Sequence, residues 1–197
     1  MRGLLIIFAF SGLEAVATAQ VRGANEHEGF YLRLHLGGGG VSMTTPNASA
    51  SGAGAAFGIS IGGAVAPNVI LYAAGFDDVA IDPNIRYGSL SGPAGDATAG
   101  VYGFGPGVAI YFMPVNVYLS ATVALSHIIV EQHDADIARS NWGPGISLML
   151  GKEWWASDHW GLGVALQVYG GRIPAGGDGN PTWSVGALSL AFSATYN

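Results

Sequence analysis

A strict two-residue alternation of side chains is the feature that most constrains what this chain can fold into. Between Val117 and Ser126, every second side chain is apolar, and the intervening ones are small, polar or, at Tyr118, aromatic. Successive side chains of a strand point to opposite faces, so this period of two predicts a β-strand with one apolar face. Val69–Ala80 is also extended, but its phase is ambiguous. With the segments that alternate similarly, the count is eight strands, the others being Phe30–Gly37, Phe57–Gly62, Gly103–Phe112, Asn141–Trp155, Trp160–Gly170 and Leu188–Tyr196.

The low charge content indicates what surrounds these apolar faces. Only 10% of the 197 residues are Asp, Glu, Lys or Arg, whereas about 25% is usual in soluble domains. No run of eighteen apolar residues follows Gln20, so no transmembrane helix can be drawn. In lipid, the only other structure that satisfies every backbone group is a closed barrel. We therefore predict an all-β fold, an eight-stranded antiparallel transmembrane up-and-down β-barrel. A soluble β-sandwich is the alternative, but its solvent face would need charged side chains that these strands lack.

The N-terminus predicts export from the cytoplasm. Arg2 precedes the apolar run Leu4–Phe10, and Ala17-Thr18-Ala19 fits an A-x-A cleavage site. We predict a signal peptide at 1–19, with cleavage after Ala17 as an alternative, then a short periplasmic segment at 20–28 and the barrel at 29–197. A short N-terminal membrane helix is the competing interpretation, but the run is shorter than the roughly 20 residues that a span needs.

The predicted connections alternate in length. Short turns are expected at Ala66–Asn68, Pro114–Asn116 and Ala156–His159, which are rich in Pro, Asn, Asp and Ser. The longer connections expected between them are Ser42–Ser51, Asp82–Thr98, Glu131–Ser140 and Pro174–Pro181. Transmembrane barrels of the outer membrane keep short turns in the periplasm and long loops outside, so this alternation predicts four extracellular loops.

Aromatic side chains gather at the strand ends that adjoin the short turns. They are expected to form a girdle at one membrane interface. Lys152 shares the lipid-facing phase of its strand, and its ammonium is expected to reach toward water. The predicted girdle consists of Phe30, Phe112, Trp154, Trp160 and Tyr196.

The opposite faces of the strands predict a polar cluster in the lumen. It consists of Arg33, His35, Tyr118 and Glu153. An eight-stranded barrel is only wide enough to be filled by its own side chains or to hold one small ligand. We predict that Arg33 contacts Glu153 directly, through water or through a third residue such as Tyr118, and helps to plug the lumen. Two separately hydrated charges at the rim are the alternative.

Composition excludes several classes of function. Without cysteine there is no disulfide, no thiolate nucleophile and no Cys-based zinc site. Seven basic residues against thirteen acidic ones, with no basic run, argue against nucleic-acid binding. We predict no cofactor, and we expect general porin activity to be absent because the barrel is narrow.

Three motifs could carry chemistry. Ser126 and His127 are adjacent, so a strand points them to opposite faces, and Glu131 reaches His127 only if the strand end bends. His133–Asp136 carries metal-ligating groups but is better interpreted as a solvated acidic loop. Gly103–Gly107 is not a nucleotide fingerprint because Pro106 prevents a following helix. We therefore predict no catalytic residues and no metal ligands.

The chain resembles the small eight-stranded outer-membrane barrels of Gram-negative bacteria, the OmpA-like and OmpW-like superfamily. The segments Gly105–Pro114, Leu150–Trp155 and Trp160–Gly163 resemble uncharacterised barrel proteins of myxobacteria. Phe192 and Tyr196 resemble the C-terminal assembly signal, although the chain ends in Asn197. The resemblance implies the outer membrane as location, insertion by the barrel assembly machinery, and contact with outer-membrane lipid and lipopolysaccharide.

Three functions follow from the sequence and this resemblance. The first is a structural or interaction barrel that presents four extracellular loops and is not an enzyme. The second is OmpW-like binding or passage of a small apolar molecule. The third is a lipid A-modifying enzyme, which the resemblance allows because some barrels of this size use a His/Ser/acid set.

Overall fold

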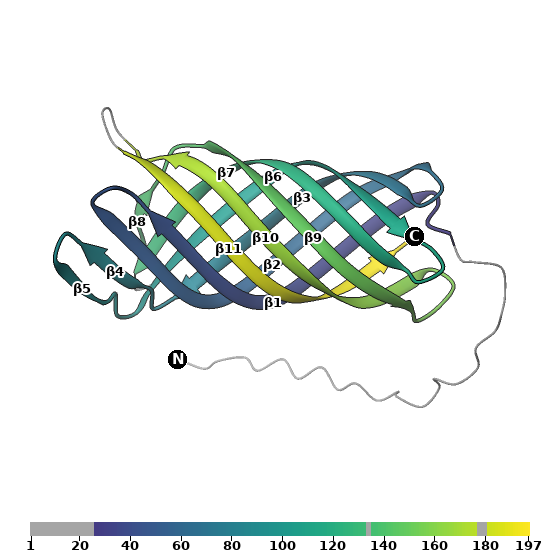
Figure 1. Cartoon of the computed structure of the whole chain (residues 1–197), viewed down its shortest axis with the longest axis horizontal. Helices are drawn as coiled ribbons and strands as arrows, with labels where there is room; N and C mark the ends of the chain where they lie inside the picture. The colour runs from purple at the N-terminus through teal and green to yellow at the C-terminus, as the bar shows by residue number, and fades with distance from the viewer. Residues whose placement is uncertain (1–25, 133–134, 177–180) are drawn as a thin grey trace.

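The computed structural model describes residues 26–132, 135–176 and 181–197, so the predicted signal peptide lies outside the described residues. Eight long strands form the wall of a barrel, and three short strands lie at one end of it (Figure 1). The long strands are β1 (Phe30–Thr44), β2 (Ala48–Ala66), β3 (Val69–Ile81), β6 (Ala97–Phe112), β7 (Val117–Gln132), β9 (Gly143–Trp155), β10 (Trp160–Pro174) and β11 (Thr182–Tyr196). The short strands are β4 (Asn84–Tyr87), β5 (Leu90–Pro93) and β8 (Ala135–Arg139).

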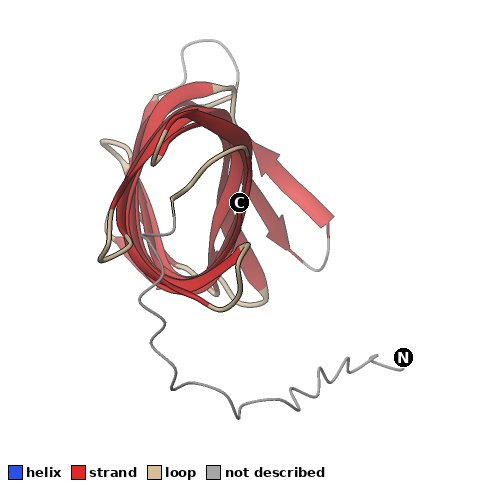
Figure 2. Ribbon diagram, turned by 90° about the vertical axis from the view of Figure 1, so that its right-hand side faces the viewer, coloured by secondary structure: helices blue, strands red, loops and turns tan. Residues whose placement is uncertain are grey.

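The barrel is closed by its first strand. β1 pairs with β2 on one side and with β11 on the other, and every pairing of the wall is antiparallel. Viewed along its axis, the wall is a complete ring (Figure 2). Closure leaves no wall strand with an unpaired edge, which is what a strand needs in lipid. The predicted eight-stranded antiparallel barrel is confirmed. Among the described residues, no helix has the length and apolarity to cross a membrane.

The two ends of the barrel differ. Residues 67–68, 113–116 and 156–159 form the tight turns at one end, where the C-terminus also lies (Figure 1). We call this the short-turn end and the opposite one the loop end. β4 and β5 form a hairpin at the loop end, where β4 continues the sheet by pairing with the start of β2. β8 pairs with the end of β7.

The strands run farther toward the loop end than the sequence predicts. Ser42–Ser51 is not a long loop, because β1 continues to Thr44 and β2 begins at Ala48. Glu131 also belongs to β7, and β11 begins at Thr182 instead of Leu188. Wall strands of 13 to 19 residues exceed the roughly 9–11 needed to cross a bilayer. Beyond Leu36, the outward positions of β1 carry only glycine, serine and threonine, so the alternation gives no apolar signal over the rest of this strand.

The two faces of the wall follow the predicted phases. Leu162, Val164, Leu166 and Val168 of β10 are exposed outside, while the residues between them are buried inside. The same alternation resolves β3, whose phase is ambiguous in the sequence. Ile70, Tyr72, Phe76 and Asp78 point into the lumen.

Candidate functional site

The lumen holds the buried polar groups of the barrel, and its filling begins before β1. His27 is completely buried at the short-turn end, with its ring stacked on Tyr111 at 3.6 Å between centroids. Its Nε2 donates a hydrogen bond to Asn116 Oδ1 (2.9 Å). Its backbone N–H donates to Asn68 Oδ1 (3.0 Å), and its carbonyl accepts from the N–H of Asn68 (3.1 Å). The segment before β1 is thereby tied to two of the short turns, and it covers this end of the lumen.

Both asparagines owe their positions to the turns that they form. Asn68 has a φ of 64° and Asn116 a φ of 52°, a left-handed conformation that asparagine tolerates better than most residues. The turn between β2 and β3 thus presents Asn68, and the turn between β6 and β7 presents Asn116. The sequence identifies both turns, but it offers no signal that His27 would fold back against them.

Arg33 occupies the next layer of the lumen. It is only 2% exposed, and its Nη2 donates to Ser120 Oγ (3.0 Å). Its Cζ lies 4.4 Å from the centroid of the Tyr118 ring, 5.8 Å from that of Tyr31 and 5.9 Å from that of Tyr72. Aromatic faces attract a guanidinium most strongly where water is excluded. The three tyrosines therefore compensate part of the cost of burying this charge.

Glu153 also lies in the lumen, and its hydrogen-bond partners differ from that of Arg33. It is 1% exposed, and its Oε1 accepts hydrogen bonds from Thr195 Oγ1 (2.6 Å) and Ser193 Oγ (3.1 Å). The Tyr118 hydroxyl donates to Met149 Sδ (3.3 Å), and the Tyr118 side chain also contacts Arg33 and Ser193, the latter a hydrogen-bond partner of Glu153.

Arg33 and Glu153 form no direct ion pair, so the direct form of the predicted contact is wrong, whereas the predicted route through Tyr118 agrees with these contacts. The alternative of two charges hydrated at the rim is wrong because both are buried. Glu153 of β9 passes over the glycines Gly161 and Gly163 of β10, so its carboxylate meets the hydroxyls of β11 before it could reach β1.

A third polar layer lies nearer the middle of the barrel. His35 is 6% exposed, and Gln167 Nε2 donates to Asp78 Oδ2 (3.4 Å) with both residues buried. A cavity of about 10 Å³ adjoins Arg33, His35 and Gln167, which is space for roughly one water molecule. Sequence reasoning missed Asp78 because the phase of β3 was ambiguous.

Several large lumen side chains are accommodated by a glycine on the neighbouring strand. A Cβ on any of these glycines would overlap the side chain that faces it, so the glycines provide the space in which the lumen is filled. The pairs in the strand register are His35–Gly58, Tyr72–Gly107, Phe76–Gly103, Tyr118–Gly151 and Glu153–Gly163.

Apolar side chains replace polar ones toward the loop end. Phe76 and Tyr169 pack with ring centroids 5.4 Å apart in a buried apolar layer. Above this layer, a pocket of about 280 Å³ is lined by apolar residues that include Met43, Ile128 and Trp183. We call it the vestibule. It has room for a small molecule.

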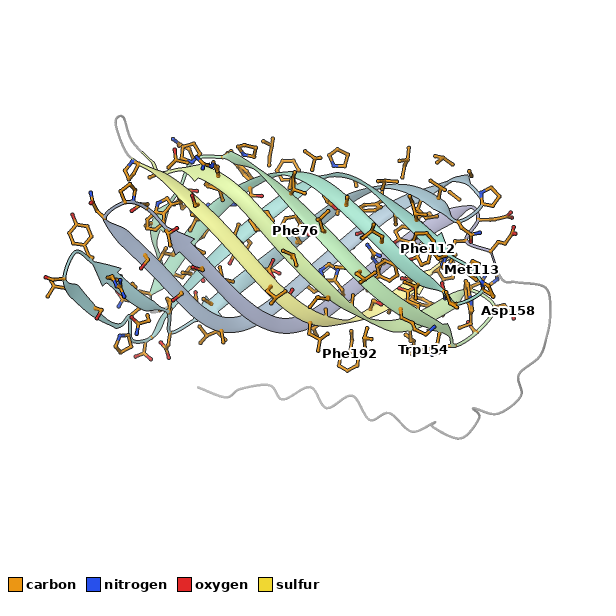
Figure 3. All side chains as sticks on the ribbon, viewed as in Figure 1. Phe76, Phe112, Met113, Trp154, Asp158 and Phe192 are labelled. Carbon is orange, nitrogen blue, oxygen red and sulfur yellow. The ribbon has the colours of Figure 1, made fainter. Side chains whose placement is uncertain are left out.

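The five predicted girdle residues all lie at the short-turn end and face outward. Phe30, Phe112 and Trp154 are more than half exposed, and Trp160 is 39% exposed. Tyr196 packs against Trp160 with centroids 5.3 Å apart and against Phe30 at 6.3 Å. Figure 3 shows Phe112 and Trp154 near this end of the barrel.

A second aromatic group, which the sequence analysis missed, lies toward the loop end. Phe104 and Trp142 meet edge to face at 5.4 Å, and His127 lies 4.2 Å from Trp142. Phe104 and Trp142 are both about half exposed on the outer surface. Outward apolar side chains fill the space between the two aromatic groups, as they do in a lipid-facing belt.

The structure does not bring the candidate catalytic residues together. Ser126 is fully buried in the lumen, whereas His127 lies on the outer surface against Trp142. His133 and Asp134 lie outside the described residues. Gly103–Gly107 lies within β6, where Gly103 faces Phe76.

Comparison with known proteins supports the fold. No family model and no curated protein matches the sequence. The crystal structure of Neisserial surface protein A matches with a TM-score of 0.59 at 17% identity, over 85% of this chain and 96% of that one. OprG from Pseudomonas aeruginosa matches with a TM-score of 0.49 at 12% identity, over 88% and 99%. AlkL, determined in lipid bilayers, also has a TM-score of 0.49, at 13% identity over 91% and 95%.

The closed ring, the apolar exterior and this likeness define the chain as an eight-stranded barrel of the outer membrane. These comparisons do not support the expected relationship to myxobacterial barrel proteins.

Proposed function

We propose that the protein is a structural or interaction barrel whose lumen is plugged and whose loop end lies outside the cell. The observation that carries this proposal is the continuous filling of the lumen. His27 covers the short-turn end, the layers of Arg33, Glu153 and Gln167 follow, and Phe76 packs above them. A barrel filled in this way does not pass solutes, so its function lies on its surface.

The loop end provides the surface for such interactions. Tyr87 is 69% exposed and Leu90 is 74% exposed, on a β4–β5 hairpin that contacts the wall through β2. Exposed aromatic and aliphatic side chains on a projecting hairpin are typical of contact surfaces. The other loop-end connections complete the four extracellular loops that we propose.

Single-cysteine labelling tests the orientation cleanly because the chain has no cysteine of its own. Ser91→Cys places a thiol on β5, and Ser157→Cys places one in a short turn. A membrane-impermeant maleimide applied to intact cells should label only Ser91→Cys, and permeabilised cells should label both. Labelling of Ser157→Cys alone on intact cells would reverse the orientation and contradict the proposal.

A second candidate function is OmpW-like binding of a small apolar molecule, and the vestibule favours it. The vestibule is open at the loop end and lined by Met43, Ala99 and Trp183, while Phe76 and Tyr169 pack beneath it. This arrangement supports binding from outside more than passage. In a background in which the other four tryptophans are phenylalanine, Ala99→Phe would narrow the vestibule and should abolish quenching of Trp183 fluorescence by a brominated alkane. Unchanged quenching would exclude this site.

We infer that lipid A modification is not the function, because Ser126 and His127 face opposite sides of the wall. Mass spectrometry of lipid A from a deletion strain should show an unaltered pattern, and a lost modification would overturn the inference. Insertion by the barrel assembly machinery, contact with lipopolysaccharide and kinship with myxobacterial barrels also remain proposals, supported by the resemblance.

A further inference from the structure

The outer surface near the short-turn end carries a groove that the filled lumen does not explain. It has a volume of about 640 Å³ and an almost entirely apolar lining, which is within the range of ligand sites. Ala194 of β11 forms its floor, because Leu34 of β1 and Leu162 of β10 flank this small residue in the register. Phe192 and Trp154 form its walls, and both project outward on the same side of the barrel (Figure 3).

A cation lies beside this groove. Lys152, the only lysine of the sequence, has its Nζ 5.2 Å from the centroid of the Trp154 ring. The ammonium donates one hydrogen bond to the carbonyl of Val115 in a short turn. An ammonium has three donors, so two remain for a further acceptor. Trp154 therefore joins an apolar groove on one side to a positive charge on the other.

The combination matches the chemistry of one kind of molecule. An acyl chain would fit along Ala194 between Phe192 and Leu162, and the linked headgroup would then lie at the height of Trp154 and Lys152. Amphipathic residues such as tryptophan and lysine favour the boundary between hydrocarbon and headgroups. A single positive charge at that boundary favours a lipid with a net negative headgroup.

We propose that this groove is a binding site for an anionic phospholipid of the inner leaflet, with one acyl chain over Ala194 and the phosphate at Lys152. The assignment to the inner leaflet rests on the proposed orientation, which places the short turns in the periplasm. Lipopolysaccharide would occupy the same groove only if the orientation were reversed.

Native mass spectrometry of the purified full-length mature barrel, with defined lipids added, tests this proposal. The probes are phosphatidylglycerol, phosphatidylcholine and lipopolysaccharide. Lys152→Gln should lower the retention of phosphatidylglycerol by about five-fold, the factor expected for one lysine at a lipid surface, and should leave phosphatidylcholine unchanged. Ala194→Phe should fill the groove and lower the retention of both phospholipids.

Matched controls come from elsewhere on the outer surface. Arg172→Gln removes an exposed charge near the loop end, and Ala73→Phe enlarges an exposed alanine of β3. Neither should change lipid retention. The retention of phosphatidylglycerol by Lys152→Gln at the wild-type level would overturn the proposal, as would equal losses in the controls. Preferential retention of lipopolysaccharide that depends on Lys152 would also overturn it. If Lys152→Gln retains phosphatidylglycerol at the wild-type level while Ser91→Cys is labelled on intact cells, the lipid site is refuted and the proposed function is unaffected.

Discussion

Substitution of Gly151 tests how tightly the lumen is packed. Gly151 pairs with Tyr118 across β9 and β7, and a Cβ there would lie 2.6 Å from both Cε1 and the hydroxyl oxygen of that tyrosine. The ring has no room to withdraw, because Arg33 lies 4.4 Å from its centroid and the Tyr111 ring lies 5.2 Å away. We therefore expect Gly151→Ala to lower the free energy of unfolding by about 1–3 kcal/mol, the usual cost of overpacking.

The matched control is Gly170→Ala on β10. This glycine faces outward, and an added Cβ would meet no atom within 4 Å. Its expected effect is within about 0.5 kcal/mol. Urea unfolding in phospholipid vesicles, followed by tryptophan fluorescence, measures both variants. In a Tyr118→Leu background, Gly151→Ala should lose most of its cost because the clashing atoms are gone. Equal stability of Gly151→Ala and Gly170→Ala would refute the tight packing.

Three further predictions concern the lumen and the loop end. Exchanging the charges (Arg33→Glu with Glu153→Arg) should not restore the thermal stability that either single variant loses. The reason is that three tyrosine faces disfavour a carboxylate at position 33. Recovery of the melting temperature in the double variant would show that the two charges interact as a pair. His27→Ala should lower the free energy of unfolding by about 2 kcal/mol through loss of a buried ring and its hydrogen bond. The exposed His159→Ala should cost less than about 0.5 kcal/mol in the same urea titration, and equal losses would argue against the cover at the short-turn end. Replacing residues 84–93 by a Gly-Ser linker should leave the urea midpoint of unfolding nearly unchanged, because the hairpin pairs with the wall at only four positions of β2. A large drop in the midpoint would show that the hairpin contributes to the stability of the wall.

The faces of the wall were predictable because the lipid belt imposes a strict alternation. Leu162 to Val168 show this, since every outward residue is aliphatic and every inward one differs in size or polarity. β3 was not predictable in the same way. Val69 and Ile70, and Leu71 and Tyr72, place apolar side chains on both faces, so only pairing with β2 and β6 fixes its phase.

The strand ends and the lumen contacts were harder to predict, each for a physical reason. The first residues of β2 are alanine, serine and glycine, which carry no alternation of large apolar and polar side chains, so the sequence does not show that the strand begins at Ala48. The burial of Arg33 and Glu153 and the proximity of Tyr118 followed from their inward phase, but the hydroxyl partners of the two charges did not. Those partners lie on β7 and β11. The alternation of side chains shows which residues face the lumen, but it does not show which of the hydroxyls and rings there a given charge contacts.

The central claim is that the lumen is plugged from the short-turn end to the layer of Phe76 and Tyr169, and conductance measures this most directly. The purified barrel, inserted into a planar lipid bilayer in 1 M KCl, should give no stable single-channel steps. The structure predicts this result because the cavity beside Arg33 and His35 holds about 10 Å³, roughly one water molecule and too little for a hydrated ion. Reproducible steps from the wild-type barrel, with the same amplitude in His27→Ala, would contradict the account.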